Sequence, residues 1–196
     1  MSKKQIAWIV VIAVVVVFVG WLVSGYNGLA RADESVSKAW ANVESQYQRR
    51  ADLIPNLVET VKGYTDHESQ TLNELTEARS RATGIQIDPQ HVTPEQLATY
   101  QKAQNQVGAS LGRLIAISEN YPDLKASQNF QELQVQLEGT ENRIQKSREE
   151  YNVAVQDYNI RVRIFPNNLI ARIFSFERKA PFQSIEGSDV APQVKF

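Results

Sequence analysis

IAWIVVIAVVVVFVGWLV, residues 6–23, is the stretch that organises this chain, because it holds no charged or strongly polar side chain. At about 1.5 Å per residue a helix of this length covers roughly 27 Å, close to the hydrocarbon thickness of a bilayer. Trp8 and Trp21 lie near its ends, where indole rings favour the headgroup region. The run therefore predicts a transmembrane anchor that contacts the lipid bilayer from Ile6 to Val23.

A cleaved signal peptide is the alternative interpretation of this run. The apolar part of a signal peptide is only about 7–15 residues long and ends at a small-residue cleavage site. Here the run is longer, and Ser24, Gly25 and Tyr26 follow it, which is a poor cleavage context. An uncleaved span is the favoured interpretation.

The charges that flank the span indicate its orientation. Lys3 and Lys4 directly precede it, whereas Arg31 and Lys38 lie farther away on the other side. Because lysine and arginine near a span stay in the cytoplasm, we expect the N-terminus inside and the rest of the chain outside.

Composition excludes several functions. The 196 residues include 21 basic and 22 acidic side chains, so nothing indicates the clustered basic face of a nucleic-acid-binding protein. The absence of cysteine excludes disulfides, thiolate metal sites, cysteine nucleophiles and lipid attachment through cysteine.

Heptad patterning dominates the rest of the chain. Apolar and aromatic residues recur at alternating spacings of four and three, which predicts helices packed along helices. The first stripe contains Val36, Trp40, Val43, Tyr47, Arg50, Ile54, Leu57, Val61 and Tyr64. Pro55 lies within it, and either a kinked continuous helix or a break with a new start would accommodate it. The unbroken phase favours the continuous helix, with Trp40 in the core.

Two further stripes follow a loop that is marked by Thr83-Gly84, Asp88-Pro89 and Thr93-Pro94. Thr93 and Pro94 form a good helix start, with a hydroxyl at the N-cap and proline at the first helical position. The second stripe contains Leu97, Tyr100, Val107, Leu111, Leu114, Ile115 and Tyr121. The third contains Phe130, Leu133, Leu137, Ile144, Tyr151, Val155, Tyr158, Val162 and Phe165.

These patterns predict an all-α fold with an N-terminal transmembrane helix. An elongated antiparallel bundle of three long helices plus a short C-terminal helix would follow it. The expected divisions are a flank at residues 1–5, the anchor at 6–24, the bundle at 26–175 and a tail at 176–196. Rods of about 40 residues would be about 60 Å long, so we expect the domain to pack against copies of itself.

Short motifs along the chain carry a resemblance to a known family. They are YNGL (26–29), AWANV (39–43), RRADLIPNLV (49–58), VKGY (61–64), HE (67–68), EAR (77–79), SENYPDL (118–124), the two YN pairs (151–152 and 158–159) and FPNNLIA (165–171). In this order, and over nearly the whole part after the anchor, they resemble the LemA family.

The resemblance implies a bacterial membrane-associated helical bundle with no established enzymatic activity. Many members resemble lipoproteins with a cysteine just before the Tyr-Asn motif, whereas Ser24 and Gly25 stand there in this chain. The uncleaved helix would replace the lipid. The relatives support a place in the bacterial inner (plasma) membrane, with the bundle in the periplasm.

Asp66, His67 and Glu68 form the one cluster that suggests metal or acid–base chemistry. Adjacent helical residues point in different directions, and a zinc site needs three or four ligands. A solvated or interface-polar turn is therefore favoured over an enzyme using His67 and Glu68. We predict no catalytic residue, no metal ligand and no cofactor, and keep both residues as interaction candidates.

Polar residues beside the stripes are further candidates. Arg50 occupies a stripe position next to Arg49 and Asp52, so its guanidinium should enter the bundle and pair with an acid such as Glu119 or Glu149. This structural role is favoured over contact with lipid phosphate or a partner. In the Tyr-Asn pairs we expect the ring to pack and the amide to make a cap or helix contact.

The short piece with Leu169, Ile170, Ile173 and Phe174 is apolar and has arginines nearby. It is expected either to cap the bundle or to lie in a headgroup layer. With three long helices the chain would end away from the membrane, so this piece should be membrane-distal. It would then contact a neighbouring subunit or an opposing membrane.

None of these motifs forms a recognisable catalytic site. The favoured function is a non-catalytic, membrane-anchored, self-associating scaffold of the bacterial envelope that organises the membrane or membrane proteins. The alternative is an accessory or sensory subunit that binds a membrane protease or signalling protein. The expected partners are the bilayer, further copies of this chain and a membrane protein, with no nucleic acid.

Overall fold

A computed structural model describes residues 2–65 and 68–183 of the chain. Its helices are α1 (Lys3–Lys62), α2 (Ser69–Thr83), α3 (Pro94–Ser118), α4 (Pro122–Ala126), α5 (Gln128–Arg163) and α6 (Asn167–Ile173). The described residues contain no strand. The predicted all-α bundle with an apolar N-terminal helix is confirmed.

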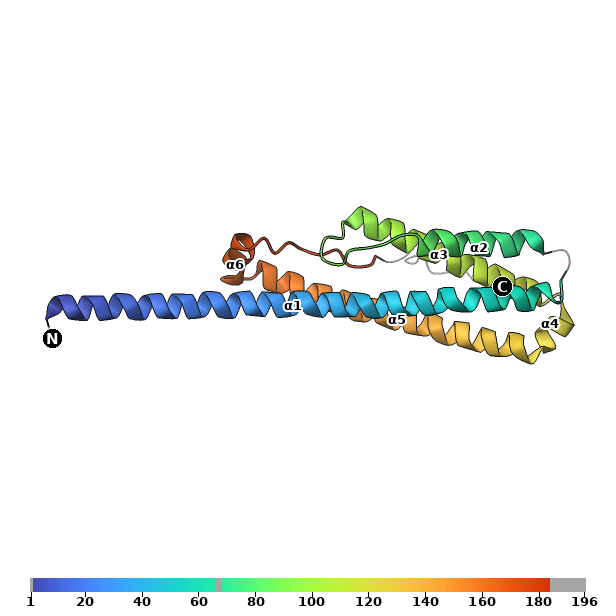
Figure 1. Cartoon of the computed structure of the whole chain (residues 1–196), viewed down its shortest axis with the longest axis horizontal. Coiled ribbons are helices and arrows are strands. Elements are labelled where there is room, and N and C mark those ends of the chain that lie inside the picture. The colour runs from blue at the N-terminus through green and yellow to red at the C-terminus, as the bar shows by residue number, and fades with distance from the viewer. Residues whose placement is uncertain (1, 66–67, 184–196) are drawn as a thin grey trace, which may run out of the picture.

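Helix α1 joins the anchor and the first bundle helix into one rod of 60 residues. At about 1.5 Å per residue the rod is about 90 Å long, and its N-terminal third projects beyond the other helices (Figure 1). Pro55 lies inside the continuous helix with its side chain exposed, which confirms the absence of a break. The predicted stripe is buried from Val36 to Val61, whereas Tyr64 follows the end of the helix and is 46% exposed.

Helix α2 was not predicted as a separate element. It turns back beside α1 and packs mainly on α3. Leu72, Leu75, Ala78 and Ala82 recur on one face and are buried, so only this narrow face is apolar. The bundle therefore has a fourth long segment that the heptad stripes did not reveal.

The extra helix reverses the predicted position of the C-terminal piece. Helices α1 and α3 run away from the N-terminus, and α2 and α5 run back toward it (Figure 1). Helix α5 packs along α1, so α6 lies beside α1 just after its apolar run. The expectation of a membrane-distal α6 is wrong, because four long segments bring the chain back to the side from which it started.

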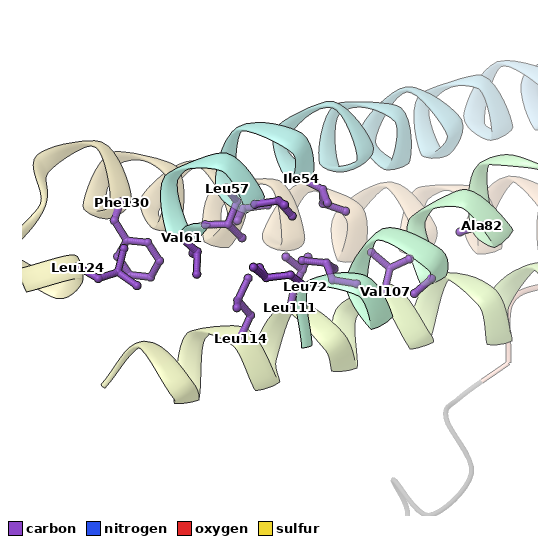
Figure 2. Close-up of a cluster of buried hydrophobic side chains, with 14 of the residues drawn as sticks. Ile54, Leu57, Val61, Leu72, Ala82, Val107, Leu111, Leu114, Leu124 and Phe130 are labelled. Atoms are coloured by element: carbon purple, nitrogen blue, oxygen red, sulfur yellow. The ribbon is translucent and has the colours of Figure 1, made fainter. Parts of the chain in front are cut away.

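Two clusters of buried side chains fill the bundle. The one at the far end joins α1, α2, α3, α4 and α5 through aliphatic residues and Phe130 (Figure 2). The second, nearer the anchor, centres on Trp40, whose ring centroid lies 5.5 Å from that of Tyr100 and 5.5 Å from that of Tyr151. Trp40 is thus a core residue, as predicted. Phe165 follows the end of α5 and is 78% exposed, so its place in the third stripe is wrong.

Candidate interaction surfaces

Arg50 enters the bundle, as its stripe position predicted, and is only 3% exposed. Its guanidinium donates hydrogen bonds to Glu141 Oε2 (3.0 Å) and to the main-chain and side-chain oxygens of Gln104 (both 2.8 Å). It also lies 5.1 Å from the centre of the Tyr47 ring. The acid is therefore Glu141 of α5 and not Glu119 or Glu149. Glu119 follows the end of α3, whereas α5 is the helix that packs along α1. Glu149 is also on α5, but it lies eight residues, or about 12 Å, farther along the helix than Glu141.

Arg49 and Asp52 point outward and have a different environment from Arg50. Both are exposed, and Asp52 accepts a hydrogen bond from Gln48 Nε2 at 2.7 Å on the same helix face. Both side chains are therefore available for contact with a partner.

The Asp66-His67-Glu68 cluster is only partly described, because Asp66 and His67 lie outside the described residues. Glu68 precedes α2, and its Oε1 accepts a hydrogen bond from the Tyr121 hydroxyl at 3.1 Å. This bond raises the pKa of Tyr121 and ties the α1–α2 turn to the start of α4. Glu68 thus joins two turns at the far end of the bundle.

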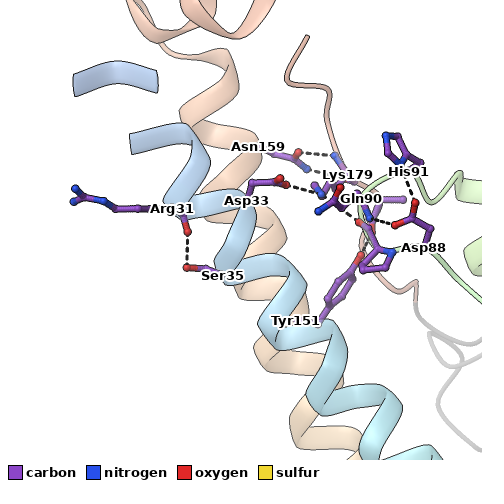
Figure 3. Close-up of polar contacts among 11 residues, drawn as sticks. Arg31, Asp33, Ser35, Asp88, Gln90, His91, Tyr151, Asn159 and Lys179 are labelled. Atoms are coloured by element: carbon purple, nitrogen blue, oxygen red, sulfur yellow. Dashed lines mark hydrogen bonds and ion pairs between the residues drawn. The ribbon is translucent and has the colours of Figure 1, made fainter. Parts of the chain in front are cut away.

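Residues 176–183, the start of the predicted tail, pack along the bundle as an extended strap. The strap lies between α5 and the loop that precedes α3 (Figure 3). The Asn159 side chain donates to Lys179 O (2.8 Å) and accepts from Lys179 N (2.9 Å). Asn152, seven residues earlier, makes the same pair of bonds with Phe182, at 3.1 and 2.8 Å.

Two side chains of the strap enter the interior. Lys179 is buried and forms an ion pair of 2.6 Å with Asp33 of α1, while its ammonium donates to Pro89 O at 3.2 Å. Phe182 stacks on Trp40 with a centroid distance of 5.9 Å. The Tyr-Asn pairs thus use the ring for packing and the amide to hold a neighbouring backbone. The sequence signal for the strap was the repeated pair itself, at a spacing of seven.

The tyrosines that line this region are kept neutral by burial. Burial raises the pKa of Tyr151 to about 12 and that of Tyr158 to about 12. Burial also raises the pKa of Tyr100 well above its usual value. An ordinary tyrosine is already uncharged at neutral pH, so burial extends the neutral form of these phenols into the alkaline range.

Helix α6 divides its predicted candidates between two faces. Ile170 and Ala171 are buried against Leu29 of α1, and the Ile170 side chain occupies the space above Gly25. Leu169, Ile173 and Phe174 are exposed. The Phe174 ring also lies edge-on to Tyr26 with centroids 4.8 Å apart. One face of α6 caps the bundle and the other faces outward.

The outer face of α5 carries exposed aliphatic side chains far from α6. Val135 is 67% exposed and Val153 is 61% exposed. They are separated by 18 residues, about five helical turns, so they point in the same direction. Ile160, 7 residues after Val153, continues this line within about 20° and is also exposed.

Metal-ligating chemistry finds little support in the described part of the chain, where no group of three or more histidine and carboxylate side chains could hold an ion. His91 Nδ1 lies 2.8 Å from Asp88 Oδ2, and both side chains are largely exposed. Their hydrogen bond lowers the pKa of Asp88. The pair closes a surface turn.

The fold defines a class of protein. Among the described helices only α1 is long and apolar enough to cross a membrane, and this part of it is not buried by the bundle. A single-pass membrane protein with one elongated helical bundle is the class that these features define.

The chain belongs to the LemA family, whose model matches residues 39–196. It is similar to magnetosome protein MamQ 2 of Paramagnetospirillum magneticum, with 27% identity over 92% of this chain and 74% of that protein. It is also similar to magnetosome protein MamQ of Magnetospirillum gryphiswaldense, with 26% identity over 91% of this chain and 73% of that protein. Protein LemA of Metamycoplasma hominis is 26% identical over 82% of this chain and 69% of that protein.

Neither the family description nor the names of these relatives state an enzymatic activity. Together with the apolar helix they indicate a membrane-associated protein.

Proposed function

We propose that this protein is a non-catalytic scaffold of the bacterial envelope, anchored by α1, which associates laterally with copies of itself. By doing so it organises the inner membrane or proteins within it. The bundle stands on the periplasmic side, as the lysines before the span favour. The observation that carries the proposal is the aliphatic line on the outer face of α5, which is exposed within the part of the chain that the structure describes.

This line has the chemistry of a weak lateral contact. Between Val135 and Val153 the same face presents Asn142, Lys146 and Glu149, so it combines apolar groups with both signs of charge. Such a mixed surface is soluble on a monomer and can pair with the same face of a parallel copy in the same membrane.

Membrane anchoring makes weak contacts sufficient. A single span confines the bundles to a plane and keeps their long axes roughly parallel. The effective concentration of neighbours then rises greatly, so contacts too weak for a soluble dimer support an array. A continuous α1 favours this arrangement because no flexible linker lets the bundle tumble relative to its span.

The test is to place a charge in the line. Val153→Glu in the full-length protein, purified in mild detergent, should shift the mass from a large species toward the monomer. Gln106→Glu is the matched control, because it adds the same charge at an exposed site on α3 and should leave the mass unchanged. Mass is measured by light scattering after detergent correction.

Other outcomes would point elsewhere. A wild-type monomer that co-purifies stoichiometrically with one membrane protein would contradict self-association and favour an accessory or sensory subunit. An oligomer that withstands Val153→Glu would exclude this face of α5 as the contact.

A further inference from the structure

Helix α6 lies at the level where α1 leaves its apolar run. Ile170 and Ala171 pack on Leu29, and Trp21, inside the run, joins the same cluster. The six residues from Val23 to Leu29 correspond to about 9 Å of helix. Ile170 also lies over Gly25, which is two residues or about 3 Å beyond Val23, so α6 begins within the roughly 5–8 Å of a headgroup layer.

The exposed side of residues 164–174 is apolar, whereas a turn that faces water is usually polar. The exposed side chains are Ile164, Phe165, Leu169, Ile173 and Phe174, with Phe165 78% exposed and Ile173 66% exposed. Five large apolar groups are thus exposed within 11 residues of the chain, and such an apolar patch marks a contact site.

The charged residues of the same segment are all basic. Residues 160–175 contain Arg161, Arg163 and Arg172 and no carboxylate. Arg161 lies 3.7 Å from Asp157, whereas no ion pair of Arg163 or Arg172 is found among the described residues. A patch that combines aromatic and aliphatic groups with arginine is typical of a surface that binds anionic lipid.

We propose that residues 164–174 form an interfacial collar that lies in the headgroup layer of the bilayer crossed by α1 and binds anionic phospholipid. The apolar side chains enter the upper acyl region, and Arg163 and Arg172 contact lipid phosphates. The buried face of α6 holds the collar to α1, so the bundle has a second attachment to the membrane beside its span.

A lipid surface fits this patch better than a second copy of the chain. The patch borders the span, because Phe174 contacts Tyr26, three residues after Val23, and Trp21 packs against the cluster formed by the buried face of α6. Its net positive charge would repel the same patch on a neighbour. The inference requires α1 in a bilayer but does not depend on lateral self-association.

The absence of cysteine allows a direct measurement of depth. A spin label is attached to Ile173→Cys in the full-length protein, reconstituted at one chain per nanodisc in phosphatidylcholine with phosphatidylglycerol. Accessibility to oxygen, which concentrates in lipid, is compared with accessibility to a water-soluble nickel chelate. The label at residue 173 should be several-fold more lipid-exposed than one at Val135→Cys, an equally exposed valine near the far end of α5.

Two controls show whether the span is inserted and whether the arginines are responsible for the response to anionic lipid. A label at Val15→Cys reports whether the span itself is inserted. Replacing Arg163 and Arg172 by glutamine should make the depth at residue 173 equal in discs with and without phosphatidylglycerol, whereas the native arginines should give greater depth with it. The circular dichroism of each variant checks that the helices remain folded.

The outcomes are decisive because single-chain discs remove neighbouring copies. A label at residue 173 as water-exposed as that at residue 135, with residue 15 inserted, would overturn the collar. So would a label shielded from both quenchers, because protein and not lipid would then cover the patch. Failure of self-association would leave the depth at residue 173 unchanged.

Discussion

Arg50 shows how a single polar residue on an apolar stripe fixes the register of three helices. It comes from α1, and its partners Gln104 and Glu141 come from α3 and α5. Arginine suits this position because its planar guanidinium offers several donors in a rigid arrangement. Lysine would supply the charge but not the divergent bonds.

Replacing Arg50 by alanine should lower the free energy of unfolding by about 2–3 kcal/mol, because the Gln104 oxygens lose buried donors and a cavity remains. This value lies below the roughly 3–5 kcal/mol for breaking a fully buried ion pair, since the Glu141 side chain is 47% exposed and regains water. The measurement is urea unfolding of the full-length protein in detergent, followed by circular dichroism. Arg49→Ala, at an exposed neighbour, should change the value by no more than about 0.5 kcal/mol; equal effects of the two variants would refute the internal role.

Tyr151 makes a prediction about pH. Its pKa is raised by burial to about 12 from an ordinary value of 10.0, so the folded state holds its proton while the unfolded state loses it. Stability should therefore be constant from pH 7 to 9 and fall between about pH 10 and 12, by about 2 kcal/mol from this group. Tyr151→Phe should be less stable at neutral pH, since its bond to Ala180 O is lost, but should decline less steeply in alkali. Tyr64→Phe, at an exposed ring, should keep the wild-type slope; an unchanged slope in Tyr151→Phe would contradict the assignment.

At the scale of elements, the strap and α2 decide the architecture although neither has a strong pattern of its own. The strap gains its position from side chains of α5 that pair with its backbone, as a neighbouring strand would. Helix α2 gains its position from four small or aliphatic residues on one face. Both elements depend on surfaces built by the longer helices.

Removing one asparagine should release the strap. Asn159→Ala deletes two hydrogen bonds to Lys179, worth about 1 kcal/mol each, so the population of the open strap should rise about 30-fold. Trypsin then cuts after Lys179 correspondingly faster, as measured by mass spectrometry of limited digests. Asn142→Ala, at an exposed site on the same helix, should leave the cutting rate unchanged. If both variants are cut at the wild-type rate, the amide does not hold the strap.

The whole molecule is a rod attached to a membrane at one end. From Val23 to the end of α1 at Lys62 is 39 residues, or about 60 Å of continuous helix. The strap, α5 and α6 all support the part of this rod nearest the bilayer, so the bundle should remain upright on its span.

We therefore expect a protein layer that extends about 60 Å from the bilayer, slightly less with tilt, when the full-length protein is reconstituted in supported membranes. Neutron reflectometry measures this thickness. A variant with a flexible glycine–serine insert after Lys38, within the supported part of α1, should give a thinner and broader layer. A wild-type layer only as thick as one bundle lying flat, about 20–25 Å, would exclude the upright rod.

The positions of many residues could be predicted from local pattern. The buried faces of α1, α3 and α5 follow their heptad stripes, and Arg50 and Trp40 lie inside because their positions on a stripe require it. The errors have physical causes. Tyr64 and Phe165 continue the spacing, but the helices end before them, and α2 was missed because its narrow apolar face gave no long stripe.

The sequence by itself determined the all-α class, the apolar N-terminal helix and the faces that pack, because each depends on periodicity and composition along one segment. Only the tertiary structure decided that Glu141 is the partner of Arg50, that residues 176–183 lie on the bundle and that α6 returns to the end of the span. These features depend on the number and direction of helices and on contacts between residues far apart in the chain, and neither is encoded in the period of any single helix.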